Sequence, residues 1–312
     1  MGSGFPSRSL KNMTAFLHEL YDSGLGALLG ASLLGKTADQ FWYVDGNNGS
    51  DQNDGKTSSS AFLTFAPLDS VLGNGDVIVM SGVVRDQWIA PIDVFDVTII
   101  GAANSPRQAT DGGVATGGGA TWLAPTSPAA ATPLLELREQ AWKIYNIFFA
   151  AETDAACVKL NRQEVSAAMD ASHAMFVNCR FGGGGIGIED YGGHRNIQII
   201  NCIFRNLTYA IDSTNVSIAT PAEWQIIDCQ FLESNINGIV IPMNACVIKG
   251  CSINKATTTT IDISGGGNNH VQQNSFNIAG ADFDPAGGII GNSTDAWSNT
   301  LTLTIETGVP AN

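Results

Sequence analysis

The chain has 312 residues, of which 15 are Lys or Arg and 29 are Asp or Glu, so its formal net charge is −14 at pH 7. This charge argues against nucleic acid and anionic lipid as partners, because both bind proteins through clustered Lys and Arg. The 35 Gly residues, with abundant Asn, Thr, Ser and Ile, favour a turn-rich β protein over a helical one.

Residues 1–40 differ from the rest of the chain and are predicted to form a docking or capping arm. Apolar residues recur there at helical spacing, at Leu10, Met13, Leu17, Leu20 and Tyr21. A small apolar run at 25–34 is too short to span a membrane, and Glu19 and Asp22 before it do not fit the basic start of a signal peptide. We expect this arm to dock on a neighbouring subunit or particle. A helix that caps the open end of the following domain is the alternative, and one segment can do both.

Asp45, Asn47 and Asp51 lie at alternating positions near the start of the next region, as the ligands of a calcium loop do. The twelfth position of that template holds Lys56, however, and no bidentate Glu closes the loop. We interpret the segment as a hydrogen-bonded turn and keep calcium as the alternative. No other metal and no cofactor is predicted.

Two later segments interrupt the pattern of the chain. Residues 102–132 contain a Gly-rich run and several Pro residues, which indicates a long inserted loop, with Trp122 packing it back. Residues 161–173 indicate a second insertion, with one helical turn at 163–169.

One short phrase recurs between residues 178 and 276. Its copies are Asn178-Cys179-Arg180-Phe181, Asn201-Cys202-Ile203-Phe204, Asp228-Cys229-Gln230-Phe231, Gly250-Cys251-Ser252-Ile253 and the degenerate Asn274-Ser275-Phe276. The second residues of successive copies are 23, 27, 22 and 24 positions apart, a spacing typical of a stacked structural unit. The sequence therefore predicts a solenoid.

The residues around each copy alternate between apolar and polar, which predicts a short strand on either side. The phase breaks at the Asn or Asp, residues that tolerate a left-handed bend. A third apolar pair follows ten to fifteen residues on, at Ile186/Ile188, Ala210/Ile211, Val240/Ile241, Ile261/Ile263 and Ile289/Ile290. Each unit is thus one coil of a parallel β-helix, with like residues stacked on like.

Four of the six Cys residues occupy the second position of the phrase, and Cys157 and Cys246 lie outside it. No paired C-x-x-C spacing occurs, so we expect buried, reduced thiols, with disulfides or a metal site as the alternative.

The first part of the domain sharpens this interpretation. Residues 43–51 read Tyr-Val-Asp-Gly-Asn-Asn-Gly-Ser-Asp, residues 53–55 read Asn-Asp-Gly, and residues 75–82 read Gly-Asp-Val-Ile-Val-Met-Ser-Gly. With the coil pattern, these motifs resemble the right-handed parallel β-helix of pectin-lyase-like proteins, as it occurs in bacterial surface proteins and in bacteriophage tail spikes and head proteins. The resemblance covers residues 41–292 and implies an all-β solenoid. The remaining residues, 293–312, have room for a short C-terminal strand, expected at 301–305, and a tail. The resemblance is specific for fold alone, because the same fold hosts lyases, hydrolases, adhesins and inert spikes.

When the third sides of the coils are aligned, Glu189 and Asp212 occupy the same position in neighbouring coils, and Asp190 is adjacent to Glu189. The next two coils have Pro242 and Ser264 at this position. Two carboxylates on neighbouring coils would be about 5 Å apart, as in a retaining glycosidase. They are the catalytic candidates of the chain. No Arg or Lys base aligns beside an acidic stack, and the four His residues are scattered, so an enzyme is not the favoured interpretation.

Three functions agree with these observations. The favoured one is a bacteriophage virion structural protein, a capsid decoration, head fibre or spike, expected to be a homotrimer. It would project from the particle surface, hold other virion proteins through its N-terminal arm and adhere to host surface carbohydrate. The alternatives are a tail-spike polysaccharide depolymerase, either hydrolase or lyase, and a secreted or cell-surface bacterial adhesin.

Overall fold

The structure, a computed structural model, describes residues 40–102, 120–162, 170–213, 219–232, 235–254, 259–263, 266–279, 289–290 and 296–304. The predicted N-terminal arm, except for Gln40, lies outside this part of the chain. Within it the fold is almost entirely β, with two short 3-10 helices, η2 (Ser58–Ser60) and η3 (Ala66–Ser70). All the strand pairings are parallel, which confirms the predicted solenoid.

Sheet A has 17 strands and forms two sides of the solenoid. The strands of its first side are β1 (Phe41–Asp45), β2 (Val77–Ser81), β5 (Thr98–Gly101), β8 (Lys143–Tyr145), β11 (Met175–Val177), β14 (Gln198–Ile200), β17 (Gln225–Ile227), β20 (Val247–Lys249), β23 (His270–Ala279) and β25 (Ala296–Thr304). Those of the second side are β3 (Val83–Arg85), β6 (Thr121–Leu123), β9 (Phe148–Ala150), β12 (Arg180–Gly182), β15 (Ile203–Phe204), β18 (Gln230–Phe231) and β21 (Ser252–Asn254), and the long β23 and β25 continue onto this side.

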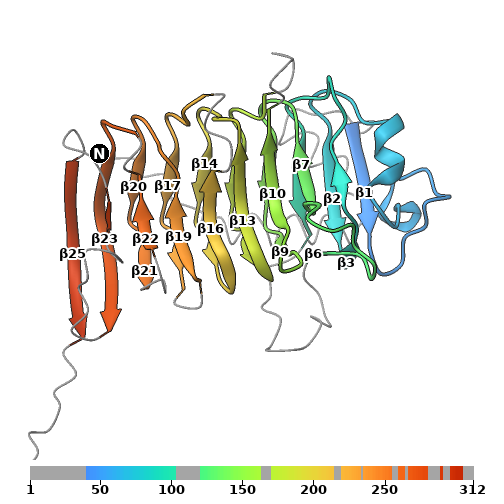
Figure 1. The fold of residues 1–312 in the computed structure, drawn as a ribbon. Coiled ribbons are helices and arrows are strands. Elements are labelled where there is room, and N and C mark those ends of the chain that lie inside the picture. Colours follow the sequence, from blue (N-terminus) through green and yellow to red (C-terminus); the bar gives the residue numbers. More distant parts are fainter. Residues whose placement is uncertain are drawn as a thin grey trace, which may run out of the picture.

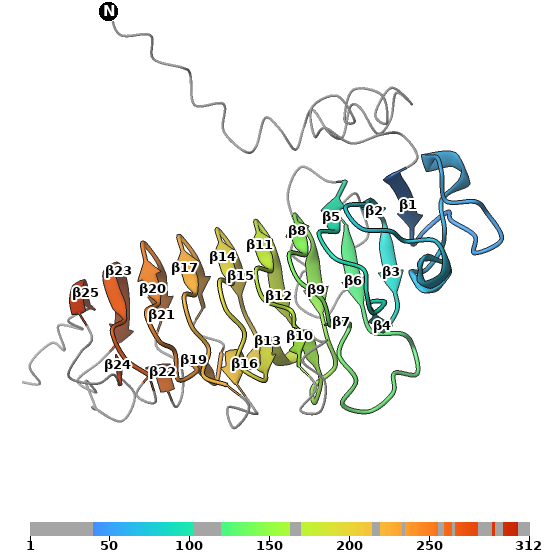
Figure 2. The same cartoon turned by 90° about the horizontal axis from the view of Figure 1, so that it is seen from above.

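Sheet B has 8 strands and forms the third side. Its strands are β4 (Trp88–Ile89), β7 (Leu135–Leu137), β10 (Ala156–Asn161), β13 (Gly184–Tyr191), β16 (Leu207–Ser213), β19 (Asn237–Val240), β22 (Thr259–Asp262) and β24 (Ile289–Ile290). Successive coils stack along one axis, from β1 at one end to β25 at the other (Figure 1). The view from above shows the sheets enclosing one continuous interior (Figure 2).

The bend between the two sides of sheet A has the predicted left-handed backbone. Asn178, Asn201 and Asp228 have φ angles of 54°, 52° and 53°. The amides also stack from coil to coil, since Asn178 Nδ2 donates to Asn146 Oδ1 at 3.0 Å and Asn201 Nδ2 donates to Asn178 Oδ1 at 3.3 Å. An Asn at this position therefore serves both the turn and the contact between coils.

The fifth copy of the phrase has a different register from the predicted one. Ser275 pairs with Ser252, so Asn274, and not Ser275, occupies the place that Cys251 holds in the preceding coil. The bend residue is then Gln273, with φ 57°. Asn274 is fully buried, and its side chain bonds the main chain of the coil below: Cys251 N–H donates to Oδ1 at 2.8 Å and Nδ2 donates to Ile248 O at 2.9 Å.

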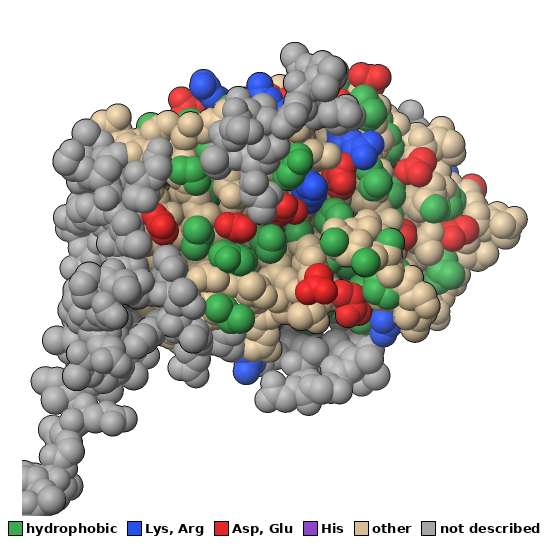
Figure 3. Space-filling view, viewed as in Figure 1, with side chains coloured by type: hydrophobic (Ala, Val, Ile, Leu, Met, Phe, Trp, Pro, Cys, Tyr) green, Lys and Arg blue, Asp and Glu red, His purple; other side chains and the backbone are tan. Residues whose placement is uncertain are grey.

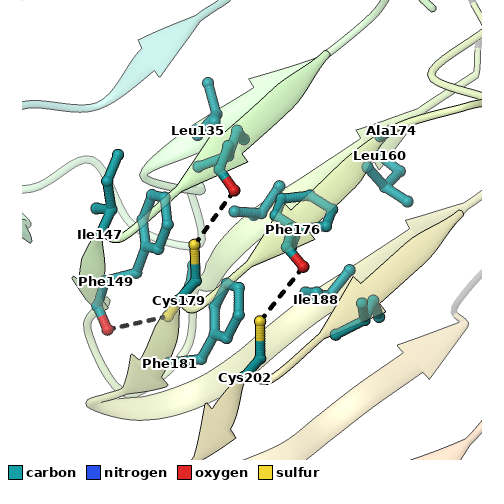
Figure 4. Packing of buried hydrophobic residues seen from close by; sticks show 14 of the residues in the cluster. Leu135, Ile147, Phe149, Leu160, Ala174, Phe176, Cys179, Phe181, Ile188 and Cys202 are labelled. Carbon is teal, nitrogen blue, oxygen red and sulfur yellow. Dashed lines mark hydrogen bonds between the residues drawn. The ribbon is translucent and has the colours of Figure 1, made fainter. Parts of the chain in front are cut away.

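The interior contains two stacks of like residues, as predicted. The rings of Phe149, Phe181, Phe204 and Phe231 stack in that order, with centroids 5.4, 4.9 and 4.9 Å apart. Beside them, Cys179, Cys202, Cys229 and Cys251 are buried free thiols. Their Sγ atoms donate to carbonyl groups of the preceding coil, as Cys202 Sγ does to Phe176 O at 3.5 Å (Figure 4). The two cysteines outside this stack are also buried, and burial raises the pKa of the Cys157 thiol to about 12.

The boundaries predicted from the sequence differ from the structure in three places. On the third side of one coil, the sequence predicted Val240 and Ile241 as the inward pair, whereas Ile239 and Ile241 point inward and Val240 points outward, because Ile239 pairs with both Ile211 and Ile261. The inserted loop at 102–132 contains strand β6, whose Trp122 is fully buried in the interior, and its residues 103–119 lie outside the described part. The C-terminal strand is longer than predicted and belongs to the solenoid, since β25 pairs with β23 along most of its length. The helical turn predicted at 163–169 lies outside the described residues.

Candidate functional site

The candidate site lies on the outer face of sheet B. Side chains alternate along a strand, so Ile188 and Ile211 point into the interior, while Glu189 and Asp212 point outward. Parallel pairing without register shifts then places one outward residue of each coil above the next. We call this set the outer row of sheet B: Glu136, Lys159, Glu189, Asp212, Val240 and Asp262.

Glu189 and Asp212 are register partners, so the predicted alignment of these two carboxylates is confirmed. Strands in a sheet are about 4.8 Å apart, which brings the two side chains within reach of one sugar residue. Val240 and Asp262 follow in the row, where the sequence predicted Pro242 and Ser264; that part of the alignment is wrong, because β19 begins earlier than expected.

The environment of Asp212 favours its protonated form. Burial, with a smaller contribution from the negative charge of Glu189, raises the pKa of the Asp212 carboxyl to about 6, although the backbone N–H of Ser213 opposes the shift. An acid with such a pKa can donate a proton near neutral pH. Asp212 therefore has a shifted pKa of the kind that acid–base chemistry uses, which aligned acidic residues alone would not ensure.

The coil before Glu189 adds a cation, and the strand of Glu189 itself adds an aromatic ring; the sequence alignment identified neither. Lys159 lies in the outer row between Glu136 and Glu189. Its Nζ lies 4.1 Å from the ring centroid of Tyr191, two residues further along the strand that carries Glu189. Asn146, three residues before Phe149 and with φ 61°, marks the bend of this coil and was the signal that could have aligned it.

Glu136, the first acidic residue of the row, is held by two neighbours. Arg138 Nε donates to Glu136 Oε1 at 2.6 Å, and Asn161 Nδ2 donates to the same oxygen at 2.8 Å. Figure 3 shows the resulting surface: a line of acidic side chains crosses this face, and basic side chains lie among them near the position of β7. The site thus presents carboxylates, amide and ammonium groups and a phenol ring on one rigid face.

Asp190, predicted to lie beside the pair, points the other way. Its side chain is fully buried, as is that of His194, and its Oδ1 contacts His194 Nδ1. Asp190 Oδ2, His194 Nε2 and Ser213 Oγ are buried without a hydrogen-bond partner. This cluster therefore belongs to the interior and not to the outer face.

The candidate calcium residues serve as hydrogen-bond acceptors within their loop. Asp45 Oδ1 accepts from the N–H groups of Asn47 and Asn48, at 2.9 and 3.2 Å. Asp51 Oδ1 accepts from the N–H groups of Leu63 and Thr64, both at 2.9 Å, and Asn47 Oδ1 accepts from Val83 N–H at 3.1 Å. These bonds fit the interpretation as a hydrogen-bonded turn, which joins the loop to β3 and to the segment before η3.

No family model matches the chain, and no curated protein matches it in sequence. Among solved structures, pectate lyase Pel9A is similar over 85% of this chain and 77% of its own, at 10% identity and a TM-score of 0.52. A rhamnogalacturonan lyase is similar over 76% of this chain and 68% of its own, at 15% identity and a TM-score of 0.34. The enzymatically active domain of bacteriophage CBA120 tailspike protein 2 is similar over 73% of this chain but 39% of its own, at 9% identity and a TM-score of 0.41.

The likeness to the pectate lyase agrees with the parallel sheets and shows the fold, a right-handed parallel β-helix of the pectin-lyase-like kind. At this identity it carries no function with it. None of the helices in the described part of the chain has the length and hydropathy of a membrane span.

Proposed function

We propose that this protein is a structural component of a bacteriophage particle, a head decoration, fibre or spike that projects from the particle surface and binds host glycans. The observation that carries the proposal is the outer row of sheet B, an ordered set of side chains on a stack of coils, all of them polar except Val240. The fold supports it, because each coil buries its apolar side against its neighbours and the solenoid can extend into water without a partner. The motifs at 43–55 and 75–82, which resemble those of phage β-helices, connect the fold with a virion.

The chemistry of the outer row suits a carbohydrate. Glu189 offers acceptor oxygens and Lys159 offers donors, which together match the hydroxyl groups of a sugar. Tyr191 adds a flat apolar surface with a polar tip, and the Lys159 ammonium above the ring orients it. Because the coils stack in register, the side chains of the row follow one another along the solenoid axis at a constant spacing, as the residues of a polysaccharide chain do.

Attachment to the particle is assigned to the N-terminal segment. Residues 1–40 combine an amphipathic stripe, the helically spaced apolar residues between Leu10 and Tyr21, with the apolar run at 25–34. Apolar surfaces of this kind need a partner to cover them. We propose that part of this segment binds other virion proteins, and that the assembled form is a homotrimer.

Glycan binding by the full-length protein tests the proposal. Tyr191→Ala and Lys159→Ala should each weaken binding to the host surface polysaccharide by about tenfold, since each removes a contact of the row. Gln198→Ala is the matched control, because Gln198 lies on the outer face of sheet A. Equal binding by all variants would reject the site. If imaging of intact particles found no copy of the protein on them, the virion assignment would be rejected.

A depolymerase is the second candidate, and one observation favours it. Burial raises the pKa of Asp212 to about 6, and Glu189 stands beside it on the neighbouring coil; two carboxyl groups at this separation are the arrangement that a retaining glycosidase uses. Release of oligosaccharides from the host polysaccharide by the purified protein would move this candidate ahead of the first.

A further inference from the structure

The first strands of sheet A carry apolar side chains on both faces. Trp42, Ile78 and Ile99 belong to the main interior. The residues that alternate with them form a second apolar cluster on the outer face of the sheet, which we call the outer patch: Phe41, Tyr43, Ala61, Val77, Val79, Ile100 and Tyr145. An apolar cluster outside the solenoid serves no purpose in closing the coils.

The outer patch is already covered. Val77, Phe41 and Tyr43 have exposed fractions of 1%, 4% and 6%, although they point away from the interior. Within the described part of the chain, the apolar members of the cluster come from β1, β2, β5 and β8 themselves, apart from Ala61 at the edge of β1. Strand neighbours alone leave the outer end of such a side chain open, so apolar contact from outside the sheet is needed to complete its burial.

Two segments outside the described residues adjoin the patch, and their compositions differ. Residues 103–119 follow β5 directly and contain Val114 as their one large aliphatic residue. Residues 1–39 end beside β1, and their run 25–34 contains Leu25, Leu28, Leu29, Leu33 and Leu34. Only the second segment can bury the aromatic and branched side chains of the patch with apolar surface of its own.

The connection is long enough for the run to reach the patch of its own chain. Residues 35–40 span up to about 20 Å when extended. The patch crosses β1, β2, β5 and β8, which pair in that order, a width of about 14 Å at the usual strand spacing. The covalent link also gives the run a high effective concentration at the patch, so it outcompetes a second copy.

We propose that residues 25–34 dock on the outer patch of their own chain. This interaction covers the outer face of the first coils. It also fixes the direction in which residues 9–22, which contain the amphipathic stripe, leave the solenoid, so that the stripe remains available for attachment to the particle. The docking itself does not depend on glycan binding or on a virion, because it rests on the patch and the apolar run alone.

Amide hydrogen exchange of the full-length protein tests this docking. Val79→Glu places a charge in the middle of the patch, and Ile227→Glu places the same charge in the same outward row, five coils further along. We expect Val79→Glu to speed exchange in residues 25–34 by about tenfold or more, and Ile227→Glu to leave it unchanged. Exchange in β13 and β16 shows in the same experiment whether each variant is folded.

Three results would overturn the proposal. Residues 25–34 could exchange at the rate of an unstructured chain in the unchanged protein, or they could be protected equally in both folded variants. Protection that falls on dilution would place the docking between copies and not within one chain.

Discussion

The rings of Phe204 and Phe231 lie parallel, with centroids 4.9 Å apart and an interplanar angle of 3°. They are register partners in neighbouring strands of sheet A, so the strand spacing sets the distance between the rings. Phe181 lies on the other side of Phe204 at the same distance, and Phe204 is therefore covered on both ring faces. A side chain in this position cannot be shortened without leaving a cavity between two coils.

Phe204→Ala should accordingly lower the free energy of unfolding by about 3 to 5 kcal/mol, the range for an aromatic ring removed from a packed core. Urea unfolding followed by circular dichroism measures the change. Ile203→Ala, one residue earlier and on the outer face, is the control and should cost about 1 kcal/mol or less. Equal losses in the two variants would contradict the predicted packing.

The sequence predicted the interior of the middle coils well, because the bend residue, the Cys and the Phe recur with little variation. Asn178, Asn201 and Asp228 all have the expected left-handed backbone. Prediction failed where a coil departs from this phrase, as at Asn274, which takes the place of a Cys and bonds the main chain instead of packing as an apolar group.

The candidate site could be predicted only in part. The alignment of Glu189 with Asp212 was predictable because both coils contain the phrase, and the third side follows the phrase at the same distance in sequence in both. Lys159 belongs to a coil whose bend, at Asn146, is followed by Ile147 and not by Cys, so the phrase does not mark that coil. The loop between the phrase and the third side also varies in length, which explains the two-residue error in the alignment of the coil that contains Ile239.

Asn274→Ala should destabilise the C-terminal coils by about 1 to 3 kcal/mol, because it leaves the buried Cys251 N–H and Ile248 carbonyl without their partner. Asn274→Cys restores the residue type of the other coils but not these two bonds, and should recover little of the loss. Denaturant midpoints measure both variants. A Cys variant as stable as the unchanged protein would show that the bonds contribute nothing.

The buried pair of Asp190 and His194 should be sensitive to loss of either partner. His194→Ala leaves the buried Asp190 side chain without its imidazole partner, which typically costs about 1 to 3 kcal/mol. The double variant Asp190→Ala/His194→Ala should be more stable than the sum of the two single changes predicts, because both partners are then gone. His270→Ala, which removes an exposed imidazole, is the control. Additive losses in the double-mutant cycle would argue against a coupled pair.

Asp212 should make a distinct contribution to the pH dependence of stability. Its pKa is about 6 in the folded protein and about 3.9 in an unfolded chain, so between pH 4 and pH 6 the folded state binds a proton that the unfolded state has released. The free energy of unfolding therefore falls as the pH rises through this window. Asp212→Asn removes this loss. The Tm of the variant minus the Tm of the unchanged protein should therefore increase from pH 4 to pH 7.5. A difference in Tm that does not vary with pH would contradict the raised pKa.

The last prediction separates binding from catalysis at the same carboxylates. Glu189 and Asp212 project side by side from one sheet face, whereas the acid and the nucleophile of a glycosidase flank the bond that breaks. We therefore expect the purified full-length protein to release no oligosaccharide from the host polysaccharide, as judged by chromatography of the reaction mixture between pH 5 and pH 8. Glu189→Gln/Asp212→Asn keeps hydrogen-bonding groups at both positions, so it should retain polysaccharide binding to within about threefold. If instead the unchanged protein cleaved the polysaccharide and this variant did not, the pair would be catalytic, and the depolymerase would replace the structural role.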